Sequence, residues 1–311
     1  MKYIVTGGAG FIGSHIVEAI AGSHEVVVID NFSSGKPENL DTFSDNIHVI
    51  HGSIIDLPLL ENVFKEADGI FHQAAIASVA RSVDDPLETH ETNLTGTLNV
   101  LLAAQTCGVK KVVFASSSAV YGDEPTLPKR EDMPPAPLSP YAVSKLAGEY
   151  YCKVFSELFC IKTVSLRYFN VFGSRQDPHS EYSAVIPKFI SRLLDCQPPI
   201  IFGDGLQSRD FVYVKDVVQA NILAMQSSAT GTFNIGSGKS VDLNTLARTV
   251  AEIMKVKYLP IYEKPRSGDI RDSVSDITAA KKAFGFHVHH SLDAGLAETI
   301  HWFRSKKTAT P

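Results

Sequence analysis

A tyrosine and a lysine one helical turn apart are the residues of this chain best suited to acid–base chemistry. Tyr141 and Lys145 begin a segment whose pattern is typical of a helix, so their side chains share one face. An ammonium group close to a phenol favours the phenolate, as does a cationic cofactor ring nearby, and together they pull the tyrosine pKa from about 10 toward neutrality. Tyr141 could therefore accept the proton of a hydroxyl group, which Ser117, one element earlier, could bridge by a hydrogen bond. Taken alone, the same spacing is also typical of a solvated pair on a helix surface.

The first thirty residues indicate an element that could position a redox cofactor. Two apolar runs, residues 2–6 and 25–29, flank a glycine-rich turn over residues 7–13, and the second run ends at Asp30. The first glycine allows a tight turn, the second lets a pyrophosphate approach the backbone, and the third lets the following helix pack closely. The helix N-terminus offers N–H groups to phosphates, and the acid can accept two ribose hydroxyls while repelling a 2′-phosphate. The sequence therefore predicts NAD(H). The three glycines are Gly7, Gly10 and Gly13.

Apolar runs that alternate with amphipathic segments predict the fold class. Strands are expected at residues 2–6, 25–29, 47–51, 69–72, 111–115, 163–168 and 232–235, and helices at 57–65, 86–107, 141–159, 214–225, 243–254 and 292–306. This alternation predicts an α/β chain, with a doubly wound parallel sheet (Rossmann) and a smaller C-terminal α/β substrate domain. A change to proline- and glycine-rich sequence places the boundary near residue 171. Residues 1–170 would bind NAD, with 210–236 returning to that domain, and residues 171–311 would bind the substrate.

Composition and charge narrow the class of protein. The 311 residues carry a net charge of -5, with 44% hydrophobic and 20% charged residues, which is typical of a globular protein. No basic patch indicates nucleic acid, and no run of about 18 apolar residues indicates a membrane span. The chain opens on its first strand without a leader pattern, so we expect a cytoplasmic protein with reduced cysteines. His287, His289 and His290 have no further ligands nearby, so no metal site is expected.

Four motifs together resemble one known family. They are residues 6–13 (TGGAGFIG), 116–122 (SSSAVYG), 139–145 (SPYAVSK) and 166–170 (LRYFN), and segments 205–211 and 266–269 agree with them. Over nearly the whole chain this pattern is similar to the extended short-chain dehydrogenase/reductase family, in particular its UDP-sugar 4-epimerases. The resemblance implies that NAD is the cofactor and a UDP-sugar the substrate. It also implies that Ser117, Tyr141 and Lys145 are catalytic, with Tyr141 as the base.

The resemblance implies a set of cofactor contacts. Asp30 and Asn31 would hold the adenosine ribose, and residues 73–75 would line the cofactor. Tyr168 would lie near the nicotinamide. Ser53 departs from the pattern, because relatives usually carry an Asp there to meet the adenine amino group. The full set comprises Gly7, Gly10, Phe11, Ile12, Asp30, Asn31, Ser33, Gly35, Lys36, Ser53, Ile54, Gln73, Ala74, Ala75, Asn93, Tyr141, Lys145 and Tyr168.

For the substrate, the resemblance implies an anchored UDP group. Arg209 and Arg266 would clasp the diphosphate, and two guanidinium groups suit two phosphates because they match phosphate oxygens bidentately. Phe202 would lie beside the uracil, and Asp269 would hold the uridine ribose. The full set comprises Ser117, Tyr141, Asn170, Gln176, Ala184, Val185, Phe202, Arg209, Arg266, Asp269 and Ser273.

The segment after the serine run bears on the reaction. Related dehydratases and decarboxylases need an acid between the serine strand and Tyr121, whereas residues 118–120 are Ser, Ala and Val. We therefore expect an NAD-dependent 4-epimerase that interconverts UDP-glucose and UDP-galactose through a 4-keto intermediate. Ser273 is small where glucose-restricted relatives carry a tyrosine, so UDP-GlcNAc and UDP-GalNAc are expected substrates as well.

Two other functions stay open on the sequence alone. A sugar-nucleotide reductase or dehydrogenase would give net redox chemistry, with NADH formed in proportion to product. A non-catalytic NAD sensor would bind without turnover, although the intact set of Ser117, Tyr141 and Lys145 favours an enzyme. By resemblance, the helices that begin near Pro86 and Tyr141 would form the contact of a homodimer.

Overall fold

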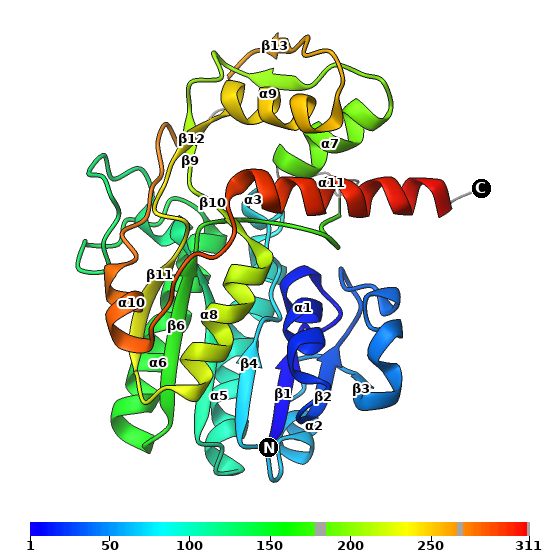
Figure 1. Ribbon diagram of the computed structural model, residues 1–311. Helices are drawn as coiled ribbons and strands as arrows, with labels where there is room; N and C mark the ends of the chain where they lie inside the picture. The colour runs from blue at the N-terminus through cyan, green and yellow to red at the C-terminus, as the bar shows by residue number, and fades with distance from the viewer. Residues whose placement is uncertain (178–184, 266–269, 310–311) are drawn as a thin grey trace.

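The central element of the structure is a parallel sheet (Figure 1). The computed structural model describes residues 1–177, 185–265 and 270–309, and within these ranges the sheet has seven strands. The strand order is β11-β6-β5-β4-β1-β2-β3, and every neighbouring pair is parallel. The predicted fold class is therefore confirmed. The strands are β1 (Lys2–Thr6), β2 (Glu25–Asp30), β3 (Ile47–His51), β4 (Gly69–His72), β5 (Lys111–Ser117), β6 (Lys162–Tyr168) and β11 (Gly231–Ile235).

Alternate side chains of the central strands enter two separate cores. Tyr3 and Val5 of β1 pack with α1 and α8, whereas Ile4 packs on the other face with α2, α5 and α6. Because helices cover both faces, the strands are almost continuously apolar. The carboxyl ends of β1, β4, β5 and β6 meet at one edge of the sheet, which is where ligands bind in such folds. These helices are α1 (Phe11–Ile20), α2 (Leu57–Val63), α5 (Gly96–Thr106), α6 (Pro140–Phe159) and α8 (Val214–Gln226).

The helix expected over residues 86–107 contains an irregular turn. α4 (Pro86–His90) passes into a π-helical turn, η3 (Glu91–Thr95), and then into α5. A π turn inserts an extra residue and reorients the neighbouring side chains. Asn93 lies in this turn and is buried. The irregular turn thus places a polar side chain in the interior, next to α6.

A cap formed by α7, α9, α11 and the strand pairs β8/β13 and β9/β12 lies above the carboxyl edge of the sheet (Figure 1). The pair β7/β10 joins this cap to the sheet. The domain boundary near residue 171 stays a prediction. The cap and junction elements are β7 (Asn170–Phe172), α7 (Val185–Leu194), β8 (Ile200–Phe202), β9 (Ser208–Arg209), β10 (Phe211–Tyr213), β12 (Val241–Asp242), α9 (Leu243–Met254), β13 (Ile261–Glu263) and α11 (Leu292–Ala309). The remaining short elements are η1 (Pro37–Asn39), η2 (Asp41–Asn46), α3 (Val79–Asp84), η4 (Ser118–Tyr121) and α10 (Thr278–Phe284).

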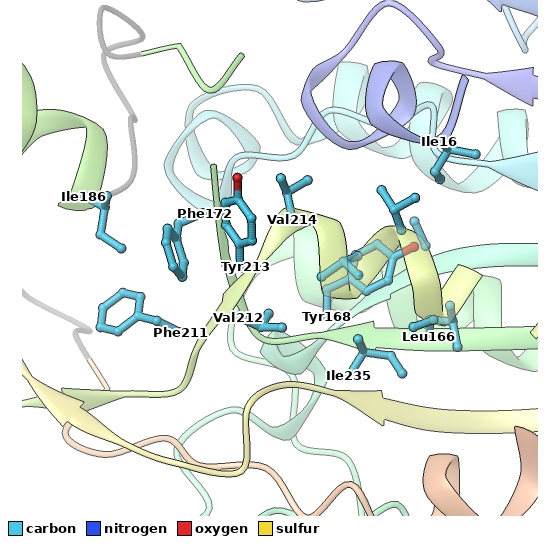
Figure 2. Close-up of a cluster of buried hydrophobic side chains, with 14 of the residues drawn as sticks. Ile16, Leu166, Tyr168, Phe172, Ile186, Phe211, Val212, Tyr213, Val214 and Ile235 are labelled. Carbon is cyan, nitrogen blue, oxygen red and sulfur yellow. The ribbon is translucent and has the colours of Figure 1, made fainter. Parts of the chain in front are cut away.

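The hydrophobic core continues from the sheet into the cap (Figure 2). Leu166 of β6 and Ile235 of β11 belong to the same buried cluster as Phe172 and Phe211 of the junction strands, and Ile186 of α7 extends this cluster into the cap. Close packing of this kind resists relative movement. Residues at the junction of sheet and cap are therefore held in place from both sides.

Candidate active site

Ser117 and Tyr141 meet at the carboxyl end of β5. Ser117 is the last residue of that strand. α6 begins with Pro140 directly after Ser139, whose Oγ accepts a hydrogen bond from the N–H of Ala142 at 3.1 Å. A serine cap followed by proline favours a helix start at this point, which places Tyr141 in the first turn. A side-chain hydrogen bond joins Tyr141 to Ser117.

Lys145 lies one turn further along α6 and is buried. Its Nζ donates to the carbonyl oxygen of Ala115 at 2.8 Å, and lies 5.8 Å from the ring centre of Tyr141 and 5.1 Å from that of Phe114. Burial lowers the pKa of Lys145 to about 7. Burial also raises the pKa of Tyr141, although its bond with Ser117 opposes this. In the protein chain by itself, desolvation of the phenolate is the dominant influence on Tyr141. The predicted lowering of the Tyr141 pKa includes the charge of a bound nicotinamide and stays a prediction.

The glycine turn between β1 and α1 has no room for side chains. Gly7 has a φ of +69°, and a Cβ there would lie 2.7 Å from the Cα of Ala74. A Cβ at Gly13 would lie 2.1 Å from the carbonyl oxygen of Gly7. Gly10 occupies the N-cap position of α1, with no side-chain hydrogen bond to the first turn. The first N–H groups of α1 are therefore available to a phosphate, as the sequence predicts.

A cavity of about 410 Å³ lies beside the end of β2, where adenosine is expected. Asp30 is buried there, and its carboxylate accepts the N–H groups of Ala9 at 2.9 Å and Phe32 at 2.8 Å. Burial raises the pKa of Asp30, and these two bonds oppose the shift. A Cβ at Gly35 would lie 2.8 Å from Asp30 Oδ2, which explains the glycine in this loop. The cavity is lined by the predicted residues Asp30, Asn31, Ser33, Ser53, Ile54, Ala74 and Ala75, and by Ser34, Gly52, Ile76, Ala77, Ser78, Arg81, Glu88 and Thr92, which the sequence analysis missed. The cavity and the glycine turn together fit NAD.

The residues that line this cavity do not include the predicted cofactor residues Lys36, Phe11 and Ile12. Lys36 donates through its backbone N–H to Ala9 at 3.0 Å, and its Nζ lies 3.5 Å from Asp177 Oδ2. Phe11 and Ile12 begin α1 and pack partly buried against the core. Contacts of these residues with the cofactor stay predictions.

Polar side chains of neighbouring elements hold the segment of residues 73–76 in place by hydrogen bonds. The hydroxyl of Tyr168 donates to Asn221 Oδ1 at 2.9 Å, and Gln73 Nε2 donates to the Tyr168 hydroxyl at 3.2 Å. Asn93 clasps Ile76, whose N–H donates to Asn93 Oδ1 at 2.8 Å and whose carbonyl accepts Asn93 Nδ2 at 3.1 Å. The sequence analysis missed Asn221, because nothing in the pattern of α8 distinguishes it from a surface position.

Several predicted substrate residues lie around one buried carboxylate, Asp210. The carbonyl of Asp210 accepts the N–H of Asn170 at 3.0 Å, and Arg209 precedes it in the chain. Its side chain accepts five hydrogen bonds at 2.5 to 3.1 Å. The donors are the N–H and Oγ of Ser237, the N–H of Gly238, and the N–H and Oγ of Ser275. Asp210 thereby holds Asn170, Arg209 and the segment of Ser273 together, although the sequence analysis gave it no role.

The other predicted substrate residues are more dispersed. Phe202 borders a cavity of about 480 Å³ together with Gln207 and Ile270. Gln176 donates through Nε2 to the carbonyl of Val171 at 3.2 Å, and Val185 begins α7. Three predicted residues lie outside the described ranges: Ala184, Arg266 and Asp269.

A comparison with known protein families agrees with this geometry. Residues 3–236 match the NAD dependent epimerase/dehydratase family. The chain belongs to this family. The match spans the glycine turn, the serine-tipped strand and the helix that carries Tyr141 and Lys145.

Individual relatives within the family have more than one activity. The UDP-glucose 4-epimerase of Mycolicibacterium smegmatis is 41% identical over 98% of this chain and 99% of its own. The solved UDP-N-acetylglucosamine 4-epimerase of Methanobrevibacter ruminantium, in complex with UDP-N-acetylmuramic acid, is 43% identical with a TM-score of 0.95 over 98% of both chains. The UDP-N-acetyl-alpha-D-glucosaminuronate decarboxylase of Bacillus cytotoxicus is 37% identical over 97% of this chain and 98% of its own. These matches confirm the predicted family, NAD as the cofactor, and the enzyme class, an isomerase.

A buried ion pair in this family member ties the catalytic helix to two strands. Glu149 of α6 accepts Arg167 Nε at 2.9 Å, Arg167 Nη2 at 2.7 Å and Ser116 Oγ at 2.5 Å. The Arg167 guanidinium lies 4.7 Å from the ring centre of Tyr121, whose hydroxyl donates to Asn234 at 2.7 Å. These contacts fix the ends of β5 and β6 relative to α6. Ser116, Tyr121 and Arg167 belong to the motifs quoted in the sequence analysis, whereas Glu149 and the ion pair were missed.

The histidines near the C-terminus serve as a structural anchor. The Asp216 carboxylate accepts the N–H groups of His289 at 3.1 Å and His290 at 3.2 Å, and lies 2.8 Å from His290 Nδ1. Among the residues that the structure describes, no group of three His, Cys, Asp or Glu side chains is arranged to hold a metal. In the same ranges, none of the helices has the length and apolar character needed to cross a bilayer.

Proposed function

We propose that this protein is a UDP-hexose 4-epimerase with tightly held NAD, which interconverts UDP-glucose with UDP-galactose and UDP-GlcNAc with UDP-GalNAc. The observation that carries the proposal is the meeting of Ser117, Tyr141 and Lys145 at the carboxyl end of β5. The glycine turn and the adenosine-sized cavity lie at the same edge of the sheet. The names of the two epimerase relatives support the reaction and leave the sugar open.

The proposed chemistry at carbon 4 is a proton transfer coupled to a hydride transfer. A bound NAD, held by the glycine turn and the cavity at Asp30, would supply the acceptor and the donor of hydride for carbon 4. Tyr141 removes the proton of the 4-hydroxyl and gives it back in the return step. Ser117, already hydrogen-bonded to Tyr141, orients the sugar oxygen. Lys145 in its ammonium form favours the phenolate of Tyr141 from 5.8 Å.

Rotation of a 4-keto sugar between the two hydride transfers requires a fixed UDP group and a loosely held sugar. We assign Arg209 and Arg266 to the diphosphate, Asp269 to the uridine ribose, and Phe202 to the uracil. The cavity of about 480 Å³ at Phe202 supports this assignment. The five hydrogen bonds on the neighbouring carboxylate, Asp210, support a rigid anchor at Arg209.

The accepted sugar depends on the room beside it. Ser273 is 9% exposed, and its N–H donates to the carbonyl of Ser208 at 3.1 Å, so its backbone is held in place. We assign its short side chain to the surface that faces the sugar. A small residue here leaves space for an N-acetyl group. Gln176, Ala184 and Val185 would border the same sugar. This supports turnover of the N-acetylated pair alongside the plain hexoses.

A decarboxylase is a second candidate, because one relative at 37% identity has that activity. Such a reaction needs an acid beside the serine-tipped strand. Here η4 presents Ser118, Ala119 and Val120 at that point, so no carboxylate stands in this described segment. Epimerisation, which needs only the Tyr141 proton transfer and a returned hydride, suits this site better.

We also propose that the protein is a homodimer built on α3, α4 and α6. These helices pack against one another and expose apolar side chains. Exposed apolar side chains on neighbouring helices are typical of a protein contact. The exposed residues are Val79, Val83, Leu87, Val143, Tyr150, Val154 and Leu158.

Proton NMR of the sugar 4-position tests the function. The purified protein, without added cofactor, is incubated separately with UDP-glucose and UDP-GlcNAc. Appearance of the axial 4-epimer in both reactions is expected, and the Tyr141→Phe variant should convert neither at a comparable rate. NADH formed in proportion to product would support the reductase instead. Conversion of UDP-glucose without UDP-GlcNAc would remove the N-acetylated pair from the proposal.

A further inference from the structure

His72 lies at the centre of a buried hydrogen-bond chain. It ends β4, in register with Thr6 at the end of β1, and is 1% exposed. Its Nδ1 lies 2.7 Å from Thr6 Oγ1, and its Nε2 lies 3.0 Å from Thr97 Oγ1 of α5. The imidazole therefore bridges the first strand of the sheet and a helix on one of its faces.

The direction of each of these hydrogen bonds follows from the bond that Thr97 makes to Asn93. The hydroxyl of Thr97 donates to the carbonyl of Asn93 at 2.5 Å, so Thr97 Oγ1 can only accept from His72. A neutral imidazole has one donor and one acceptor. The proton of His72 is therefore on Nε2, and Nδ1 accepts the hydroxyl of Thr6. Thr6 Oγ1 in turn accepts the N–H of Ala74 at 3.3 Å.

The surroundings keep His72 neutral. Burial, together with the charge of Lys145, lowers the pKa of His72 to about 3. The ring centre of Phe114 lies 5.5 Å from the ring centre of His72 and 5.1 Å from Lys145 Nζ. An apolar surface therefore adjoins both groups. A protonated ring would present a second donor to Thr6 and break the ordered chain.

Each end of the chain reaches a different part of the proposed site. At one end, Ala74 packs against Gly7, where a Cβ would lie 2.7 Å from the Ala74 backbone. At the other end, the side chain of Asn93 clasps Ile76 and donates to Ser144 Oγ at 3.2 Å. The hydroxyl of Ser144 donates to the carbonyl of Tyr141 at 2.7 Å. One continuous set of bonds thus connects the cofactor-lining segment with the turn that carries the proposed base.

We propose that His72 is a positioning residue that sets the spacing between the NAD-binding segment 74–76 and the helix of Tyr141, through the ordered chain from Thr6 to Thr97. This inference rests on the proposed function, because it assigns the two ends of the chain to cofactor and base. It adds no chemical step to the reaction. Its effect is on how tightly NAD is held and on how well Tyr141 is aligned.

The tautomer of His72 in the native protein tests the proposed order of the hydrogen bonds from Thr6 to Thr97. A long-range proton–nitrogen NMR spectrum, assigned by comparison with His72→Phe, should show a neutral ring protonated at Nε2 across the range from about pH 5 to about pH 9. A ring protonated at Nδ1, or one that gains a second proton within this range, would contradict the chain. This readout needs neither bound NAD nor turnover, so it stands even where the proposed function fails.

A double-mutant cycle tests the positioning role. NAD affinity is measured by calorimetry on nucleotide-free protein for Thr97→Val, His72→Phe and the double variant. Thr97→Val alone leaves the Nε2–H of His72 without an acceptor, so affinity should fall by about tenfold or more. In the His72→Phe background the same change should have little further effect. The positioning role would be overturned if Thr97→Val lowered NAD affinity equally in the unaltered and His72→Phe proteins, or if no variant changed NAD affinity.

Two controls separate this role from a merely structural one. Thr97→Ser keeps the hydroxyl, so it should restore most of the affinity that Thr97→Val loses. In steady-state kinetics of the NAD-loaded protein, Thr97→Val should lower kcat while the KM for the UDP-sugar stays unchanged, because Thr6, His72 and Thr97 are not among the residues assigned to the UDP group. A changed KM with unchanged kcat would contradict positioning of Tyr141. If the unaltered protein binds no NAD, the proposed function fails. The tautomer of His72 still shows whether the hydrogen bonds from Thr6 to Thr97 are ordered as described.

Discussion

At the scale of single residues, the site combines two groups that burial shifts in opposite directions. The pKa of Lys145 is lowered to about 7, whereas that of Tyr141 is raised. In both cases the charged form is the one that burial disfavours. Holding these two groups in the interior therefore costs stability whenever either of them is charged in the protein chain itself.

Replacing Lys145 by methionine should stabilise the protein most at low pH. Below about pH 7 the lysine is charged in both the folded and unfolded chain, so its burial costs free energy. Between about pH 7 and the unfolded value of about 10.4, the folded chain releases a proton that the unfolded chain keeps, and the cost falls. Urea unfolding should show a gain for Lys145→Met at pH 6 that shrinks at pH 9, together with lost epimerase activity. Lys153→Met, an exposed lysine on the same helix, is the control, and an equal gain at both pH values would contradict the buried charge.

The glycine turn should not tolerate a single added methyl group at Gly13. A Cβ there would lie 2.1 Å from the carbonyl oxygen of Gly7, so α1 must move away from the turn that approaches the phosphates. Gly13→Ala should therefore lose most of its NAD on purification, as measured by absorbance of the released nucleotide. Gly22→Ala, where an added Cβ meets nothing within 4 Å, should retain it. Equal NAD content in both variants would refute the close packing.

At the scale of elements, the substrate side depends on one carboxylate that joins β9, β10 and the segments after β11. Asp210 is fully buried and accepts five hydrogen bonds from residues 27 to 65 positions away. Buried carboxylates are stable only when their oxygens are well hydrogen-bonded. The element carrying Arg209 is therefore fixed by the loops around it rather than by its own two-residue strand.

Asp210→Asn should weaken substrate binding more than cofactor binding. The asparagine side chain would place its NH₂ group against hydrogen-bond donors that now face a carboxylate oxygen. The loops at Ser237 and Ser275 would therefore separate. The KM for UDP-glucose should rise by about tenfold or more, while the NAD content stays unchanged. Asp195→Asn, which removes an exposed ion pair with Lys307, should change neither. A loss of NAD without a change in the KM for UDP-glucose would show that Asp210 supports cofactor binding and not substrate binding.

The sequence predicts elements well and tertiary side-chain contacts poorly. The strands and the start of α6 follow from local signals, namely apolar runs and the Ser139-Pro140 pair. The glycine turn follows from spacing within a few residues. Asn221 and Asp210, by contrast, act on partners 53 and 65 positions away, and no local pattern marks such partners. No local pattern indicates either that burial raises the pKa of Tyr141 in the chain by itself, because burial depends on the whole fold.

At the scale of the whole molecule, one hydrophobic core extends from the sheet into the cap. Phe172 and Tyr213 at the junction belong to one buried cluster with Leu166 of the sheet and Ile186 of the cap (Figure 2). Because this core is continuous, the proposed uridine anchor in the cap is held rigidly over the NAD-binding edge. A rigid anchor suits a reaction in which the sugar, and not the nucleotide, must turn.

The exposed apolar face of α6 gives a prediction about assembly. Leu158 is 67% exposed in the single chain, so a charge there should leave folding intact but disrupt a dimer. Light scattering should find a mass of two chains for the unaltered protein and of one chain for Leu158→Glu. Val256→Glu, at an exposed apolar residue in the segment after α9, should remain a dimer. Monomers in all three samples would contradict the proposed contact.

The central claim is that hydride leaves carbon 4 and returns to it within one site, with Tyr141 moving the proton. Incubation of the protein with UDP-glucose in D₂O, followed by proton NMR of carbon 4, measures both conversion and the origin of the returning hydrogen. UDP-galactose that keeps protium at carbon 4 is expected, without added NAD and without accumulated NADH. UDP-galactose with deuterium at carbon 4, or no UDP-galactose despite bound NAD, would contradict it.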